Sequence, residues 1–236
     1  MKHFKHLFVF GRPAGGKSEF IDFMKQCEPS KRLRDFFIAP FDELDDYLFL
    51  TELADHEDIM QKLGVPRRLT ERTSDGVAVK DDMFWGYAME RMNQVIRKKY
   101  LPNPKYYDER TLLIEFSRGI DHFSYKSALS LLDRDTLAKG AIIYVKVSFN
   151  ESLRRNESRY QEKLKHSVLA HKCPEHIMNK YYREDDWAEL TGGRQSGTIA
   201  INGVNIPFVT MENEPESKDP QVLEERYKNA LQILNS

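Results

Sequence analysis

The residues with the clearest capacity for chemistry lie in one short loop, GRPAGGKS, at positions 11–18. Gly11, Gly16, Lys17 and Ser18 match the pattern G-x-x-x-x-G-K-[ST] at every position. In such a loop the backbone N–H groups turn inward around an anion, and glycines leave room for the close approach. Lys17 can then reach the β- and γ-phosphates of a nucleotide, and the Ser18 hydroxyl can bind Mg²⁺. The alternative is a glycine-rich turn that binds nothing.

The flanking sequence supplies the elements that this loop needs. The apolar run 6–10 predicts a buried strand before the loop, and the pattern from about residue 17 to residue 27 predicts an amphipathic helix after it. A helix N-terminus adds positive potential at the place where phosphate would bind. The loop residues expected to surround the phosphates are Gly11, Arg12, Pro13, Ala14, Gly15, Gly16, Lys17 and Ser18.

With this loop as its Walker A element, the chain resembles the P-loop NTPases, and most of all their nucleoside and nucleotide kinase branch. The resemblance implies one domain over 1–236, with an acceptor-binding insertion at 41–110 and a lid at 150–190. It implies a kinase that transfers the γ-phosphoryl group of ATP, or of another NTP, with Mg²⁺. The acceptor would be a hydroxyl or phosphate on a small molecule such as a nucleoside or nucleotide. Two alternatives are a regulatory ATPase that acts on a protein partner, and a kinase of nucleic-acid ends or nucleotide-sugars.

An acidic stretch, FDELDDYL at 41–48, follows an apolar run at 36–40 that predicts the second strand. Phosphoryl transfer needs a carboxylate to accept the proton of the attacking hydroxyl. The resemblance implies that such a residue follows the second strand, so Asp42 is our first candidate base and Asp45 the second. The alternative is an acidic helix start, which the helix dipole favours in any case.

The predicted third strand, 111–116, ends in the sequence IEFSRG. An acidic residue that closes an apolar strand resembles a Walker B element, which makes Glu115 a candidate for the magnesium shell, although the usual residue is Asp. Arg118 is a candidate for binding the acceptor or a phosphate. The alternatives are a buried pair between Glu115 and Arg118, or a solvated arginine.

Arginines after the predicted fourth strand, 141–149, are candidates for a catalytic clamp. Arg155 and Arg159 share one face of a predicted helix, and Arg154 lies beside them. Their charge suits the equatorial oxygens of a transferred phosphoryl group, and the resemblance places a lid here. The alternative is an exposed helix with internal Glu–Arg pairs. Arg72, between the second and third strands, is a further candidate for binding an anionic acceptor.

Buried apolar runs alternate with helical patterns along the whole chain. This order predicts a three-layer α/β fold of the P-loop NTPase type, with about five mainly parallel strands, helices on both faces and a helical lid. Near the C-terminus, the Asn-Gly pair at 202–203 predicts a hairpin. Asp219 followed by Pro220 predicts the start of a closing helix.

The composition narrows the range of partners. The chain has 236 residues, 36 basic and 37 acidic, so its net charge of −1 argues against a nucleic-acid partner. The two cysteines form no disulfide framework, which favours a reducing, cytoplasmic setting. No run of 18 apolar residues predicts a membrane span, and the first apolar run breaks at Gly11. The oligomeric state is left open.

Overall fold

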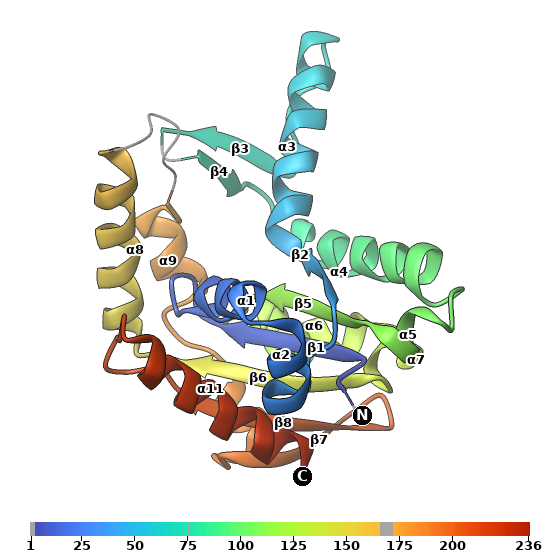
Figure 1. Ribbon diagram of the computed structural model, residues 1–236. Coiled ribbons are helices and arrows are strands. Elements are labelled where there is room, and N and C mark those ends of the chain that lie inside the picture. The colour runs from blue at the N-terminus through green and yellow to red at the C-terminus, as the bar shows by residue number, and fades with distance from the viewer. Residues whose placement is uncertain (1–2, 75, 166–171) are drawn as a thin grey trace.

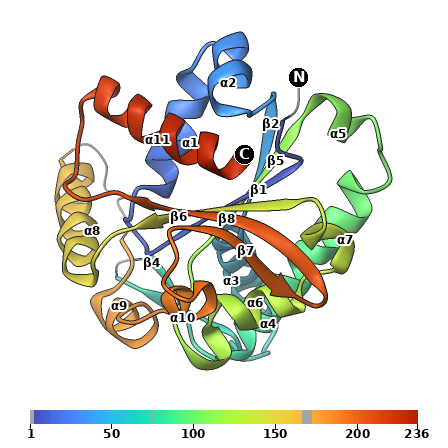
Figure 2. The ribbon, with the colours of Figure 1, turned by 90° about the horizontal axis from the view of Figure 1, so that it is seen from below.

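The centre of the molecule is a six-stranded sheet with the order β2-β5-β1-β6-β8-β7 (Figure 2). The computed structural model describes residues 3–74, 76–165 and 172–236. Neighbouring strands are parallel from β2 to β8, and β7 pairs antiparallel with β8 at the edge. The expected α/β fold with a mainly parallel sheet is therefore confirmed, with one antiparallel strand added. The strands of this sheet are β1 (His6–Gly11), β2 (Phe41–Asp45), β5 (Thr111–Phe116), β6 (Gly140–Lys146), β7 (Ser196–Ile201) and β8 (Val204–Glu212).

Helices cover both faces of this sheet (Figure 2). Alternate side chains of a strand point to opposite faces. Val9 of β1 accordingly packs in a core with α1, α2 and α11, whereas Phe8 and Phe10 pack in a second core with α4 and α6. The helices against the sheet are α1 (Lys17–Gln26), α2 (Pro29–Phe36), α4 (Met83–Val95), α6 (Tyr125–Leu131), α7 (Arg134–Leu137), α10 (Trp187–Thr191) and α11 (Pro220–Asn235).

A further group of elements lies beyond the carboxyl ends of the parallel strands (Figure 1). Helix α3 (Asp46–Lys62) continues directly from β2, and the two-stranded hairpin β3 (Thr70–Thr73) and β4 (Gly76–Val79) packs against it. Helices α8 (Phe149–Leu164) and α9 (Glu175–Tyr181) lie on the other side of the hairpin. The remaining short elements are the π-turn at Ile96–Tyr100, α5 (Tyr106–Glu109) and the 3-10 turn at Asp121–Phe123.

The structure corrects the predicted second strand. Residues 36–40 are not a strand, because α2 runs to Phe36 and Phe37 takes a left-handed conformation at its end. The Glu28 side chain accepts hydrogen bonds from the N–H groups of Ser30 and Lys31, and this cap starts the helix α2 at Pro29. The actual strand is the polar segment Phe41–Asp45, at the edge of the sheet. A short apolar run does not by itself distinguish a strand from a helix end.

Several other predicted elements lie where the sequence placed them. Strand β5 covers 111–116, and the hairpin of β7 and β8 turns at Asn202 and Gly203. In α11, the Asp219 side chain accepts a hydrogen bond from the Gln221 N–H, with Pro220 at the first position. Among the described residues, no helix is long and apolar enough to cross a membrane. Residues 166–171 of the predicted lid lie outside the described part of the chain.

Candidate active site

The loop at 11–18 joins β1 to α1 at the end of the parallel strands, where ligands of such sheets bind. Gly11 and Gly16 have positive φ angles of 145° and 107°. A Cβ atom at Gly11 would lie 2.5 Å from the Val145 carbonyl oxygen, and one at Gly16 would collide with the Asn213 side chain. Only glycine suits these two positions, so the loop's tight path depends on them.

Residues from distant parts of the chain brace the loop. The Asn213 amide donates a hydrogen bond to the Gly15 carbonyl at 2.8 Å, and the Ser152 hydroxyl donates to the Pro13 carbonyl at 2.6 Å. Arg12 points away from the loop, with its guanidinium 2.8 Å from the Asp185 carboxylate. These contacts hold the loop in one shape before any ligand arrives, which lowers the cost of binding.

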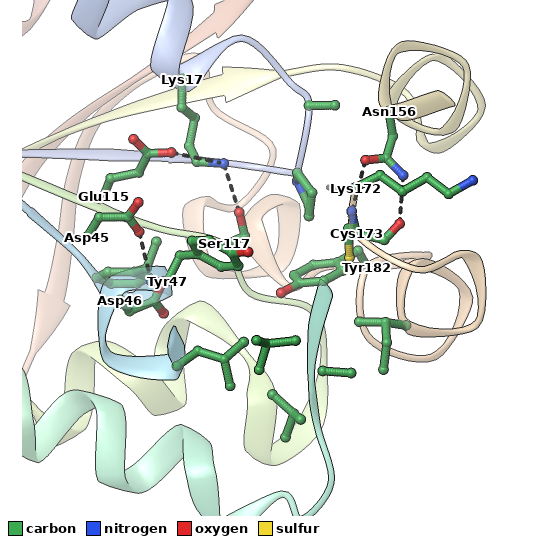
Figure 3. A pocket seen from close by; sticks show the side chains of 18 of the residues that line it. Lys17, Asp45, Asp46, Tyr47, Glu115, Ser117, Asn156, Lys172, Cys173 and Tyr182 are labelled. Carbon is green, nitrogen blue, oxygen red and sulfur yellow. Dashed lines mark hydrogen bonds and ion pairs between the residues drawn. The ribbon is translucent and has the colours of Figure 1, made fainter. Parts of the chain in front are cut away.

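The Lys17 ammonium lies at the centre of the site and is only 6% exposed. It donates hydrogen bonds to the carbonyls of Gly11 and Arg12, each at 3.1 Å, and to the Ser117 hydroxyl at 2.8 Å. It is 3.7 Å from the Glu115 carboxylate (Figure 3). The lysine therefore links the loop to the end of β5, with its charge directed into the pocket.

Two carboxylates end neighbouring strands beside this lysine. Asp45 ends β2 and pairs in register with Glu115 of β5. Burial, together with the nearby charges of Glu115 and Asp46, raises the pKa of Asp45 to about 7. Burial also raises the pKa of Glu115, against the opposing effect of Lys17. A carboxyl group with a pKa near neutrality can exchange a proton at physiological pH.

Arg118 is buried and does not line the pocket, although the sequence made it a candidate for binding the acceptor. Its guanidinium donates to the Asp46 carboxylate at 2.6 Å and lies over the ring of Phe116, 4.7 Å from its centroid. Asp46 does line the pocket. Arg118 therefore pairs with Asp46 and not with Glu115, the partner in one of the alternatives, and it orients a carboxylate of the pocket.

The three arginines of α8 have different surroundings. Arg159 lines the pocket and pairs with Glu19 at 2.7 Å. Arg155 is fully buried, where it pairs with Glu151 at 2.7 Å and donates to the Asn213 carbonyl. Arg154 is exposed and pairs with Glu151 and Glu216. Of the predicted clamp, only Arg159 is brought to the pocket.

Asp42 and Arg72 lie away from the pocket, which corrects the reasoning that selected them. Asp42 stands near the start of β2, opposite Leu112 in register, and pairs with Arg110 at 2.8 Å. We chose it because it follows the expected strand at 36–40, and the true strand ends at Asp45 instead. Arg72 pairs with Asp55 and Asp58 of α3.

The pocket itself has a volume of about 300 Å³, which is large enough for a small ligand. Its polar side includes loop residues, among them Lys17 and Ser18, and the carboxylates of Asp45, Asp46 and Glu115. Its other side is apolar and comes from α3, β4, α4 and α9; we call Leu50, Val77, Val79, Phe84, Trp85 and Ile177 the apolar wall.

Sequence reasoning missed the apolar wall and Ser117. Ser117 directly follows the predicted third strand, so its position was a usable signal. The apolar wall gives no signal in the sequence, because its residues belong to four separate elements and each resembles an ordinary core residue.

The residues at the site also fit a magnesium ion. Ser18 and Glu115 both line the pocket next to Lys17, and they offer the oxygen ligands that Mg²⁺ prefers. The described residues include no cluster of three or more His, Cys, Asp or Glu side chains that could hold a metal by themselves. Mg²⁺ in phosphoryl-transfer sites usually has one or two protein ligands and takes the rest from phosphates and water.

The fold is that of a three-layer α/β protein, with a glycine-rich loop of the pattern G-x-x-x-x-G-K-[ST] between its first strand and first helix. No protein-family model matches the chain, and no curated protein matches it. Its similarities are to solved structures that span nearly its whole length.

One of these is a gluconokinase from Sinorhizobium meliloti 1021, with 11% identity and a TM-score of 0.48 over 98% of this chain and 94% of that one. Another is a sugar kinase from Janibacter sp. HTCC2649, with 12% identity and a TM-score of 0.41 over 98% of this chain and 95% of that one. Both TM-scores are below 0.5, so neither similarity says which reaction this chain performs.

Proposed function

We propose that the protein is a kinase that transfers the γ-phosphoryl group of ATP, or of another NTP, to a small molecule with the help of Mg²⁺. The observation that supports this most directly is the meeting of three groups in one pocket. The phosphate loop with Lys17, the carboxylates of Asp45 and Glu115, and Arg159 all line it. A transferase needs these same functions: charge on the phosphates, a base for the acceptor and a cation near the transferred group.

The loop and Lys17 would hold the triphosphate. When phosphates enter, Lys17 exchanges its hydrogen bonds to the two loop carbonyls for phosphate oxygens, and stays near Glu115. Ser18 and Glu115 would hold Mg²⁺, which neutralises charge on the phosphates.

Asp45 is the base in this proposal. Its pKa of about 7 lets it accept a proton from an acceptor hydroxyl at neutral pH. Arg159 adds positive charge from the α8 side, where the pair with Glu19 keeps it near the loop. Helices α8 and α9 would act as the lid that excludes water from the transfer.

The test is a transfer assay with γ-labelled ATP, Mg²⁺ and a pool of nucleosides, nucleotides, sugars and other small alcohols. The proposal expects label on at least one acceptor, and much less label without Mg²⁺. Rapid release of labelled inorganic phosphate that no acceptor changes, and that a protein partner stimulates, would instead support a regulatory ATPase. A protein that binds neither ATP nor any other nucleoside triphosphate would refute both.

A further inference from the structure

The apolar wall gives the acceptor side of the pocket a definite chemistry. Val77 and Val79 come from β4, Leu50 from α3, Ile177 from α9, and Phe84 and Trp85 from α4. All six side chains are less than a tenth exposed. A surface of this kind binds rings and alkyl groups by removing them from water, and it has few groups that could replace the water around a polyol.

The charges near this surface disfavour an anionic acceptor. Asp45 and Asp46 line the pocket between the loop and the apolar wall, with Glu115 beside them (Figure 3). The buried Arg118 is already paired with Asp46, and Arg72 is paired outside the pocket. A second phosphate or a carboxylate on the acceptor would therefore meet negative charge here.

The lining cations belong to the other side of the pocket. Lys17 is enclosed by the loop carbonyls, and Arg159 is paired with Glu19 of α1. Lys172 pairs with Glu157 at 2.6 Å and lies 4.7 Å from the centre of the Tyr160 ring. These positions suit the triphosphate and the rim of the pocket. Arg118 lies over the Trp85 ring of the apolar wall, 5.4 Å from its centroid, but its charge is already paired with Asp46.

Trp85 supplies an aromatic surface of the apolar wall. Its indole Nε1–H is sealed inside the protein and has no hydrogen-bond partner among the described residues, so a ligand meets the ring and not this N–H. Aromatic side chains pack well against other flat rings. A planar or apolar ring on the acceptor suits this surface.

We infer that the acceptor is an uncharged alcohol with a planar or apolar ring, and not a nucleotide, a sugar acid or a simple polyol. This inference rests on the proposed function and narrows its acceptor. The ring lies against the apolar wall, and the hydroxyl lies at Asp45. The hydroxyl oxygen attacks the γ-phosphorus and its proton passes to Asp45. The bond from the γ-phosphorus to the bridging oxygen breaks, and that oxygen leaves on ADP with the electron pair. The product is a phosphate monoester.

Matched acceptor pairs test this inference. Adenosine and uridine would each be compared with their 5′-monophosphates, and pyridoxine, gluconate and glycerol would complete the panel in an assay with γ-labelled ATP and Mg²⁺. We expect transfer to at least one neutral ring alcohol, with a kcat/KM at least about 100-fold above that for any anionic or acyclic member. Transfer mainly to a monophosphate, gluconate or glycerol would overturn the inference and leave the kinase function standing.

A binding measurement separates the two levels of the proposal. Tryptophan fluorescence would be titrated with each neutral ring alcohol, in the wild type and in Trp85→Phe; Trp187, the other tryptophan, is present in both. We expect a change in the wild type that the variant loses, because Trp85 lines the pocket. Affinity should be about 5- to 10-fold weaker in a transfer or dialysis assay, because phenylalanine offers the acceptor ring a smaller apolar surface. If no neutral ring alcohol binds at millimolar concentration, the inference is wrong. ATP binding, measured by dialysis, tests the kinase function independently.

A second variant keeps the test sharp if Trp85→Phe alters folding. Val77→Thr replaces one methyl group of the apolar wall with a hydroxyl, and the side chain keeps nearly the same shape. We expect KM for the ring alcohol to rise about tenfold while KM for ATP stays the same. The matched control is Val222→Thr, on the exposed side of α11. An unchanged KM for the acceptor in a folded Val77→Thr protein would count against the apolar wall as its binding surface.

Discussion

The two sides of the pocket are built in different ways. The phosphate side comes from eight consecutive residues, 11–18, whose shape depends on local backbone geometry at Gly11 and Gly16. The acceptor side comes from α3, β4, α4 and α9, elements that lie far apart in the chain and meet only in the fold. A local site of the first kind can be recognised in a sequence, and a site of the second kind cannot. Variants on each side test whether the two sides also have separate functions in phosphate binding and acceptor binding.

The largest effect should come from the phosphate side. Lys17→Ala removes the ammonium that the proposal assigns to the phosphates, and we expect phosphoryl transfer to fall by about 10³-fold or more. The assay is transfer from γ-labelled ATP, together with ATP binding by dialysis. The matched control is Lys25→Ala, an exposed lysine on the same helix, α1. Wild-type turnover by Lys17→Ala would remove the basis of the kinase assignment.

Asp45→Asn tests the junction of the two sides. Loss of the base should lower kcat by about 10²- to 10³-fold with little change in KM for ATP. Asp42→Asn is the matched control, since Asp42 lies on the same strand but near its other end, paired with Arg110. Equal losses of kcat in the two variants would show that a carboxylate need not lie at the end of β2 to affect catalysis.

Arg159 and Arg155 should separate catalysis from stability. Arg159→Ala leaves the core intact, and we expect kcat to fall about 10- to 100-fold with unchanged thermal unfolding. Arg155→Ala leaves the buried Asn213 carbonyl without this donor and Glu151 with Arg154 alone, and should lower the free energy of unfolding by about 3 kcal/mol. Steady-state kinetics and denaturant unfolding measure the two effects. A loss of kcat in Arg155→Ala, with a loss of stability in Arg159→Ala, would show that Arg155 is the clamp.

The smallest expected effect is a pH-dependent gain in stability. Burial raises the pKa of Asp45 to about 7 in the folded protein, so the folded state binds more protons than the unfolded state from about pH 4 to pH 7. The contribution of Asp45 to the free energy of unfolding is therefore full at low pH and is lost as the pH rises from about 4 to 7.

Asp45→Asn removes this loss and keeps a side chain that can cap α3, as Asp45 does through the Tyr47 N–H. We expect the variant to be more stable than the wild type by about 1–3 kcal/mol at pH 8, and equally stable near pH 4, without ligand or metal. Denaturant unfolding at the two pH values measures this. An equal gain in the free energy of unfolding at both pH values would show that removing the charged form of Asp45 is not the cause.

Elements with strong local signals could be predicted from the sequence. Strands β1 and β5 are continuous apolar runs, and α11 begins at a cap and a proline. The edge strand β2 could not, because its residues are mostly polar and the apolar run before it is the end of a helix. That one shift moved the strand end from residue 40 to Asp45, and it explains why Asp42 ranked above Asp45.

The sequence by itself determined the glycine-rich loop at 11–18, the parallel α/β order and the acidic character of the segment after α2, because each depends on neighbouring residues. Only the tertiary structure decided which carboxylate faces Lys17, which arginine of α8 reaches the pocket, and that the acceptor side is apolar. Those choices depend on strand register, on helix rotation against the sheet and on contacts between distant segments. Arg155 and Arg159 are alike in sequence, yet one is sealed in the core and the other lines the site.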